Sequence, residues 1–587
     1  MTQIVAIELE NFQSIEQRTR IDLKPITLLF GPNSAGKSAI FDALELLRVI
    51  LDPTVFDEEL AGDMVNRWAR EKNHDPVREL FLAIEFSYGG DTGYDVWLDD
   101  ENWQGNSRSS KFYNFHLNVP DPLGSERIIR EGEIIRIELK LKVVNINGTA
   151  ICRISELCCS VQETKILSIT KSSPKKVDEK ALAFTNSEND QGGRWLTIFN
   201  SLEGNFKDLN LIIHFHRNES NENKTNQDYV MYHDQLGDHW VLPIVSKSLS
   251  PLKIISGWIP REIDDGDVGN RICRNYIDVL FYLGTVLFKP LRNKPGIVMA
   301  DRRAPKPAEA LAVVDLGLKG WWSRDTFAPS SPANLLSSAT AKLDEHFQGL
   351  AEIAHADLLL HAAQSNNWGG AHAEKHIESV HQRARIFEKV NQHLEKNIFT
   401  EKLYKLSCAS TLLVPLDLSE DDTGGYYALA QPAAVRLFLT DGSGNKVELQ
   451  DVGSGIPFVL PILYSLACQG FVKVQQPELH LHPALQSSIA DVFVEELNSI
   501  NAGQFLIETH SEHLLLRFLR RIRDTSNGKC LSEDLRITNE QIAVYYFDPQ
   551  VSGATVVTRQ FVTPLGDFYN DWPRGFFSER NSDLFDE

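Results

Sequence analysis

Apolar and polar residues alternate along much of the first 260 positions, which is the period of a half-buried β-strand. Polar stretches interrupt the alternation, and one of them, residues 217–227, contains no apolar residue and predicts a loop. The pattern therefore predicts a β-rich region that extends to about residue 260. The predicted strands are 4–9, 21–23, 26–30, 78–99, 134–144 and 151–161.

Between residues 334 and 399 the apolar positions recur at steps of three and four, which is the period of an amphipathic helix. Two helices are predicted, at 334–363 and 371–399, with an Asn- and Gly-rich turn at 366–370. Their apolar stripe fits either a short coiled coil or a pair of helices packed on a lobe. The packed pair is favoured because the stripe is too short to establish a coiled coil. Residues 304–332, rich in proline and tryptophan, are interpreted as the link between two lobes.

Strands and helices alternate in the last part of the chain. An apolar helix at 457–468 is followed by an apolar strand at 470–474, a second helix at 484–497 and a second apolar strand at 504–507. Such a succession of strands and helices predicts a parallel α/β sheet. Further strands are predicted at 411–414, 434–439, 446–449, 541–547 and 554–562.

The loop Gly31–Ser38, with the sequence GPNSAGKS, matches the phosphate-binding pattern G-x-x-x-x-G-K-[ST]. The strand 26–30 enters it and helical periodicity leaves it, so backbone N–H groups and a helix N-terminus would face the phosphates of a nucleotide. Lys37 would reach the β- and γ-phosphates, and Ser38 would bind Mg²⁺. A glycine turn that only precedes a helix is the weaker alternative, because strand, loop, lysine, serine and helix are all in register. The predicted phosphate-binding residues are Asn33, Ser34, Ala35, Gly36, Lys37 and Ser38.

Composition narrows the class of protein. The 587 residues exceed the usual limit of one core, which predicts two or more lobes. No long apolar run and no signal-peptide pattern is visible, so we expect no membrane partner. Seven scattered cysteines without a C-x-x-C predict a reducing, cytoplasmic location and no structural zinc. The net charge of −21 does not favour binding to nucleic acid, which would need a local patch such as Arg302, Arg303 or 517–523.

Five motifs occur together in the chain: N-F-Q-S at 11–14, the loop at 31–38, DVGSGIPFVLPIL at 451–463, QPELHLHP at 476–483 and ETHSEH at 508–513. With the tail sequence GDFYNDWPRGFF, they resemble the ABC-type ATPase head of SMC, RecF and OLD proteins. Within that group the chain is most similar to the AAA-family ATPases of bacterial anti-phage defence islands. The resemblance implies an α/β fold: a split P-loop ATPase head with a long α+β insertion and a short helical hairpin.

The resemblance also implies a division of the chain. Residues 1–100 would form the N-terminal ATPase lobe with the Walker A loop. Residues 101–332 would form the β-rich insertion and linker, and 333–400 the helical hairpin. Residues 401–587 would form the C-terminal ATPase lobe, with the signature, the Walker B-like element and the switch histidine.

Two motifs of the C-terminal lobe have roles in the family. Gly453, Ser454 and Gly455 resemble the signature loop, which approaches the γ-phosphate bound by a second subunit. An ordinary glycine-rich helix start is the alternative. The functional interpretation implies a dimer of two copies with ATP between them. His510 resembles the switch histidine, whose imidazole can hydrogen-bond a phosphate oxygen.

His480 and His482 lie two residues apart, which allows a metal site, but ligands with further metal-binding spacing are missing. In the family the HLHP sequence is a recurrent part of the fold. An orienting or structural role is therefore favoured for both histidines.

The chain departs from the family at the Walker B-like element. The family usually has at least one acid where Gln475 and Gln476 stand, most often glutamate at the position of Gln475, which would help to hold Mg²⁺. Glutamine orients a water but does not accept its proton. Either this chain carries a substitution that removes hydrolysis and traps the ATP-bound dimer, which the intact remainder of the site favours, or the natural protein hydrolyses ATP slowly. Glu478 and Glu508 are the nearest acids that could substitute in part.

A smaller departure is Gln13, where relatives often place an arginine close to the nucleotide. With glutamine at this position, the sequence does not predict which residue contacts adenine.

Two functions follow from the resemblance. The first is an ATP-driven switch of a defence system, which controls a separate effector such as a nuclease. Only residues 511–587 follow His510, which is too short for a Toprim nuclease domain, so we expect none in this chain. The second is a RecF- or SMC-type ATPase that clamps DNA for repair or recombination. An ABC transporter ATPase is disfavoured because the insertion is too large.

Overall fold

A computed structural model shows the chain as two compact units, each made of segments that are distant in sequence. Unit 1 combines Met1–Leu23, Asn33–Arg292 and Phe547–Val557, and unit 2 combines Lys24–Pro32, Asn293–Tyr546 and Thr558–Glu587. The residues that the structure describes are 2–51, 58–68, 79–89, 94–95, 112–113, 118–120, 126–128, 130–146, 149–162, 164–171, 194–199, 210–215, 228–233, 239–244, 298–300, 311–314, 345–366, 373–398, 403–412, 433–449, 451–453, 455–468, 470–499 and 502–570.

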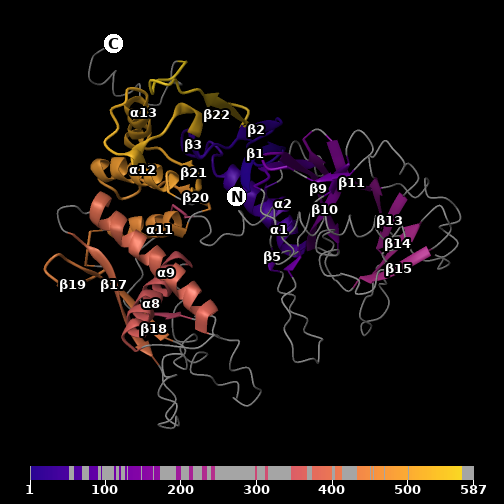
Figure 1. Ribbon diagram of the computed structural model, residues 1–587. Helices are drawn as coiled ribbons and strands as arrows, with labels where there is room; N and C mark the ends of the chain where they lie inside the picture. Colours follow the sequence, from indigo (N-terminus) through magenta and orange to yellow (C-terminus); the bar gives the residue numbers. More distant parts are fainter. Residues whose placement is uncertain are drawn as a thin grey trace, which may run out of the picture. The chain divides into compact units, whose positions relative to one another are not determined.

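Unit 1 is built on an antiparallel sheet of ten strands in the order β15-β14-β13-β12-β11-β10-β9-β4-β1-β2 (Figure 1). The predicted strands at 4–9, 134–144 and 151–161 are confirmed as parts of β1, β9 and β10. The ten strands are β1 (Gln3–Glu10), β2 (Thr19–Asp22), β4 (Leu80–Ser87), β9 (Ile134–Ile146), β10 (Thr149–Val161), β11 (Thr164–Lys171), β12 (Arg194–Phe199), β13 (Asn210–Phe215), β14 (Asp228–His233) and β15 (His239–Ile244).

Among its described residues, unit 1 also contains two helices and two short strand pairs. The helix α1 (Ala39–Leu51) follows the predicted phosphate-binding loop, and α2 (Glu58–Trp68) comes next in the chain. The pairs are β5 (Tyr94–Asp95) with β6 (Phe112–Tyr113), and β7 (Asn118–Pro120) with β8 (Glu126–Ile128). The predicted loop at 217–227 lies outside the described residues.

Opposite charges fix the register of the first strands of this sheet. Arg20 on β2 donates to both carboxylate oxygens of Glu85 on β4, at 2.6 and 2.7 Å. Arg136 on β9 donates to the same Glu85 and to Glu8 on β1. The hydrogen bonds from Arg20 outweigh the effect of burial and hold the pKa of Glu85 below its usual range. Cross-strand pairs of this kind stabilise one register over its neighbours.

Unit 2 contains most of the parallel sheet that the sequence predicts, while residues 547–557, at the ends of its last two strands, belong to unit 1. The order of the sheet is β20-β21-β3-β22-β23, and the first four strands pair in parallel. The indigo strand β3 lies between β21 and β22, which come from the last sixth of the chain (Figure 1). Every residue of β3, β20 and β21 is buried, which explains their continuous apolar sequences. The strands are β3 (Ile26–Phe30), β20 (Phe471–Gln475), β21 (Gln504–Glu508), β22 (Ile542–Pro549) and β23 (Thr555–Gln560).

Three helices pack with this sheet in unit 2: α11 (Gly455–Cys468), α12 (Pro483–Leu497) and α13 (Glu512–Ser526). Phe493 of α12 contacts Phe505 of β21 and Phe518 of α13, with ring centroids 5.4 and 6.4 Å away. The helix α13 is not among the helices predicted from the sequence, although its signals are present. Ser511 caps it, and it carries a buried face of Leu514, Leu515, Phe518, Leu519 and Ile522.

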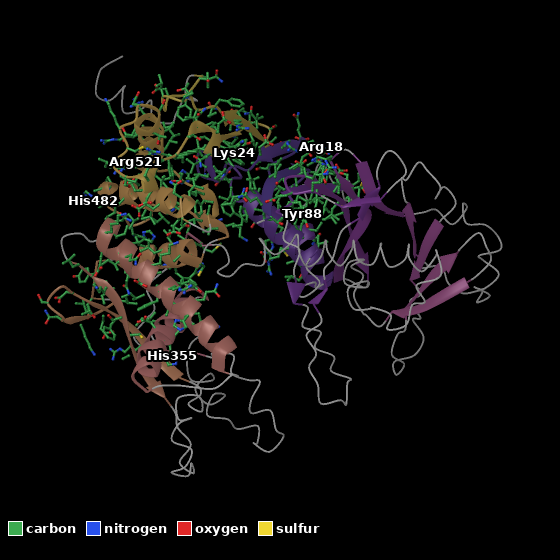
Figure 2. The ribbon with its side chains drawn as sticks, in the orientation of Figure 1. Arg18, Lys24, Tyr88, His355, His482 and Arg521 are labelled. Carbon is green, nitrogen blue, oxygen red and sulfur yellow. The ribbon has the colours of Figure 1, made fainter. Side chains whose placement is uncertain are left out.

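An ion-paired network lies between α12 and α13. Asp491 accepts hydrogen bonds from Arg517 and from Arg521, whose side chain is 2% exposed (Figure 2). Burial alone would raise the pKa of Asp491, but the two arginines outweigh it and lower that pKa. The proposed basic patch at 517–523 is therefore reduced to its exposed members Arg520 and Arg523, because Arg517 and Arg521 face the acid. Arg302 and Arg303 lie outside the described residues.

The predicted helical pair is present as α8 (Glu345–Asn366) and α9 (Ala373–His393), which continues as a short π-helix, η4 (Leu394–Ile398). The two helices lie side by side (Figure 1) and pack against α11. Their residues Phe347, Leu350, Phe387 and Val390 belong to the same apolar core as β3 and β21. The pair is thus packed on a lobe, as favoured. Residues 334–344, where the first helix was predicted to begin, lie outside the described residues.

A second sheet of unit 2 corrects the predicted linker at 304–332. Residues 311–314 of that stretch form β16 (Leu311–Val314), which pairs with β18 and so belongs to a sheet. The other strands are β17 (Lys405–Leu412), β18 (Ala433–Thr440) and β19 (Lys446–Glu448). Short 3₁₀ helices lie at Glu533–Leu535 and Asn539–Gln541. Within the described part of the chain, no helix is both long and apolar enough to cross a membrane.

Candidate nucleotide-binding site

The predicted phosphate-binding loop runs from the end of β3 to the start of α1. Gly36, Lys37 and Ser38 use their carbonyl oxygens to accept hydrogen bonds from Ala39, Ile40 and Asp42, so these carbonyls point along α1. In a trans peptide the N–H of the next residue points the opposite way. The N–H groups of Lys37 and Ser38 therefore point out of the N-terminus of the helix, which is the arrangement that binds anions.

Two residues of the loop have left-handed backbone angles. The φ angles are +63° at Ser34 and +83° at Gly36. A Cβ on Gly36 would lie only 2.0 Å from the Oγ of Ser14, so no other residue fits there. When right-handed and left-handed backbone conformations alternate in a short loop, successive N–H groups point toward one concave side. The loop therefore has the backbone of a phosphate cradle.

Lys37 and Ser38 complete the donor set. The side chain of Lys37 belongs to the buried part of unit 1, with the residue 3% exposed. A buried ammonium group is stabilised by negative charge, which phosphates supply. The hydroxyl of Ser38 is an oxygen ligand of the kind that Mg²⁺ prefers. These residues fit a magnesium-bound triphosphate.

The N-F-Q-S turn supports this loop from within unit 1. Phe12 and Ile15 exchange backbone hydrogen bonds of 2.9 and 2.8 Å, and Gln13 takes a left-handed φ of +48°. The turn places Ser14 against Gly36.

Gln13, at the position where the resemblance led us to expect an arginine, is bound to α1. Its Nε2 donates to Oδ2 of Asp42 at 2.6 Å. Burial raises the pKa of Asp42, and this hydrogen bond opposes the rise only in part. Gln13 therefore joins the turn to the first part of α1, a role that the sequence did not suggest.

In unit 2 the parallel strands bring three chain segments to one edge of the sheet. Glu508 at the end of β21 lies opposite Leu29 of β3 on one side and opposite Gln475 of β20 on the other. Gln475 is 9% exposed and Glu508 6% exposed. In open α/β sheets ligands bind beyond the carboxyl ends of the strands. The Walker B-like glutamine and Glu508 thus lie at the edge where β3 leads into Gly31.

The backbone around Gln475 is held on both sides. Its N–H donates to the carbonyl of Val298 at 2.8 Å, and the N–H of Gln476 donates to the carbonyl of Glu508 at 2.7 Å. Gln476 has a left-handed φ of +44°, which turns the chain sharply after the strand. The side chain of Gln475 therefore projects from a strand end whose backbone is fixed, whereas the side chain of Gln476 projects from a turn.

Glu478 connects the loop after β20 with the loop after β21. Its Oε2 accepts a hydrogen bond from Oγ1 of Thr509, and its Oε1 accepts one from the N–H of His510, both at 2.7 Å. Ser511 then caps α13 by accepting from the N–H of Leu514. The acid offered above as a partial substitute for the missing base is thus engaged with the predicted switch histidine.

Removing this carboxylate is expected to loosen both loops. Glu478→Ala leaves two donors without their acceptor, at a cost of about 1–3 kcal/mol each when they stay buried. We expect a melting temperature lowered by several degrees, at roughly 2–4 °C per kcal/mol, measured by calorimetry. Glu512→Ala, an acid on the same segment, is the matched control. An equal melting temperature for Glu478→Ala and the parent chain would contradict this role.

The signature-like loop lies at the start of α11. A Cβ on Gly455 would lie 3.1 Å from the carbonyl oxygen of His480, so this glycine permits close packing of two loops. A Cβ on Gly453 would meet nothing within 4 Å, so that side of the loop is open. Ser454 lies outside the described residues.

The two histidines of HLHP have structural contacts. The ring of His480 lies 4.3 Å from that of Phe458, and Nδ1 of His482 accepts from the N–H of Ala484, capping α12 (Figure 2). Among the described residues, no cluster of three histidines, cysteines or acids is suited to a metal ion. These contacts fit the orienting role that was favoured above.

Two family models match the chain. Residues 3–239 match "AAA ATPase domain", and residues 337–517 match "AAA domain, putative AbiEii toxin, Type IV TA system". The first match contains the phosphate-binding loop, and the second contains the strand ends with Gln475 and Glu508. Both matched segments are of the AAA ATPase type. The predicted fold class, a split α/β P-loop ATPase head with a long α+β insertion and a short helical hairpin, is confirmed.

Solved SMC head domains are similar to this ATPase at low identity. The SMC head bound to the C-winged helix domain of ScpA is 10% identical, with a TM-score of 0.36 over 95% of this chain and 97% of that one. The head bound to the C-terminal domain of ScpA from Pyrococcus furiosus is 12% identical, with a TM-score of 0.34 over 95% and 96%. The SMC head domain from Thermotoga maritima is 9% identical, with a TM-score of 0.30 over 95% and 98%. No curated protein sequence matches the chain.

Proposed function

We propose that this ATPase is an ATP-dependent switch that dimerises when ATP is bound and signals its state to a separate effector protein. The observation that carries the proposal is the connection through Glu478. It ties the turn after the Walker B-like strand to Thr509 and His510. A change at the strand ends is thereby transmitted to the loop of the predicted switch histidine and to the cap of α13.

In this proposal the chain's own residues hold the nucleotide and its metal. Residues 33–38 would bind the phosphates, and Ser38 would be a ligand of Mg²⁺, which would neutralise phosphate charge. In unit 2, the side chain of Gln475 would orient a water molecule but would not accept its proton. His510, in the loop after β21, would respond to whether the γ-phosphate is present or has been hydrolysed.

A second copy would complete the site with its signature loop, residues 453–455. The open side of Gly453 supports this, because a partner's nucleotide can approach it without a clash. Small residues at 453–455 would let a γ-phosphate approach the backbone closely.

The effector and the biological setting rest on resemblance. The description of the family model over residues 337–517, "AAA domain, putative AbiEii toxin, Type IV TA system", is compatible with control of a harmful effector such as a nuclease. A defence role in the bacterial cytoplasm is the setting that we propose.

The mass of the protein in solution tests the switch. With ATP and Mg²⁺ we expect twice the monomer mass by light scattering, and with ADP the monomer mass. Lys37→Ala should remain a monomer in both. The same mass in ATP and ADP for the parent chain would reject ATP-dependent dimerisation.

A DNA clamp of the RecF or SMC type is the second candidate. Two arginines of the expected patch are paired with Asp491, and the chain carries a net charge of −21, so the structure offers this candidate less support. Tight duplex binding that needs ATP, weakens steeply with salt and requires no other protein would favour the clamp over the switch.

A further inference from the structure

Within unit 1 the far end of the chain donates two hydrogen bonds, one to the phosphate-binding loop and one to the N-F-Q-S turn. Thr555, the first residue of β23, donates its hydroxyl proton to the carbonyl of Ala35 at 2.9 Å. Its N–H donates to the carbonyl of Ser14 at 2.8 Å. Thr555 is 6% exposed and Ala35 is fully buried. One residue therefore joins the N-F-Q-S turn to the phosphate-binding loop.

We propose that Thr555 is a positioning residue for nucleotide binding, because its hydroxyl orients the Ala35–Gly36 peptide toward the phosphates. The proposal rests on the assignment of residues 31–38 as the nucleotide site.

The geometry of a trans peptide gives the reason. The carbonyl of Ala35 points to Thr555, so the N–H of Gly36 in the same peptide plane points away from Thr555. Ser14 closes the side of Gly36 where a Cβ would stand. The Oγ1 of Thr555 lies 3.4 Å from that Cβ position. The Gly36 N–H is therefore left to face the concave side of the loop, together with the N–H groups of Lys37 and Ser38.

The position of Thr555 is itself fixed by a tight turn between β22 and β23. The N–H of Gln550 donates to the carbonyl of Ala554 at 2.7 Å, and Gly553 has a left-handed φ of +77°. The turn brings Thr555 out of an exposed hairpin end into a buried position. A rigid support of this kind lowers the ordering cost when a ligand binds.

The experiment compares ATP affinity in the full chain, measured by calorimetry with Mg²⁺, for variants of one residue. Thr555→Val keeps the shape and removes the hydroxyl, and we expect about tenfold weaker ATP binding, the loss of one net hydrogen bond. Thr555→Ser restores the hydroxyl and should bind within about twofold of the parent chain. Thr558→Val is the matched control, since Thr558 lies on the same strand with an exposed side chain. Inorganic tripolyphosphate, which shares only the phosphates with ATP, should lose affinity by the same factor.

If Thr555→Val does not fold, Thr555→Ala removes the hydroxyl without placing a methyl group against the carbonyl, and the same comparison holds. Parent-like ATP affinity in a folded variant without the hydroxyl would overturn the proposal. Equal weakening by Thr555→Ser would overturn it too, because packing would then be the cause. If the parent chain itself does not bind ATP, the nucleotide site fails, which is a different result from parent binding that Thr555 does not affect.

Discussion

Replacing Gln475 by glutamate is expected to raise steady-state ATP turnover by a factor on the order of 10²–10⁴, the range supplied by a positioned general base. The side chain leaves a buried strand end whose backbone is bonded to Val298, so a carboxylate there starts from a fixed position. Turnover of the variant should also rise with pH, because only the carboxylate form accepts the proton of the attacking water. Phosphate release at saturating ATP measures both effects.

Gln476→Glu is the matched control for this variant. It adds the same charge one residue later, where the chain takes a left-handed turn, and we expect less than about a tenfold change in turnover. If ATP turnover is unchanged in Gln475→Glu, the missing acid is not what limits hydrolysis. Nucleotide binding, and no longer hydrolysis, would then be the event that switches the protein.

Replacing Lys37 by alanine is expected to weaken ATP binding by a factor on the order of 10–10². Hydrogen bonds to a charged group contribute about 1.5–3 kcal/mol, and 1.4 kcal/mol is tenfold. The lysine is buried in the loop just before α1, so water replaces it poorly. Isothermal calorimetry with ATP and Mg²⁺ measures the change.

Lys24→Ala is the control, because this lysine lies just before β3 and outside the loop (Figure 2). It should bind ATP as the parent chain does. Equal affinity in Lys37→Ala and the parent chain would contradict the assignment of the loop to the phosphates.

The parts of the fold that the sequence predicts are those with a local pattern. The strand β3, the loop to Ser38 and the strands β20 and β21 follow from apolar runs and glycine spacing. Their parallel pairing follows from the alternation with helices. The assignments of residues 33–38 to the phosphates, and of 453–455, 475 and 510 to their roles, stay predictions.

What the sequence did not predict depends on contacts between distant residues. The strand β16 has four residues in a stretch rich in proline and tryptophan, and it is a strand because β18 pairs with it. Thr555 contacts Ala35 across 520 positions, which no local pattern reveals. From the sequence, Glu478 is only a nearby acid that could act as a base. The fold shows that its carboxylate oxygens accept hydrogen bonds from Thr509 and His510 in the loop after β21.

The lifetime of the ATP-bound dimer after excess ADP is added tests the central claim, that ATP closes this protein and hydrolysis opens it. Mass in solution is followed over time for the parent chain and for Gln475→Glu, both first incubated with ATP and Mg²⁺. The account predicts that both form dimers, that the parent dimer persists, and that the Gln475→Glu dimer returns to monomer as its ATP is hydrolysed. If ATP does not change the mass of either protein, or if both dimers decay at the same rate, the claim is contradicted.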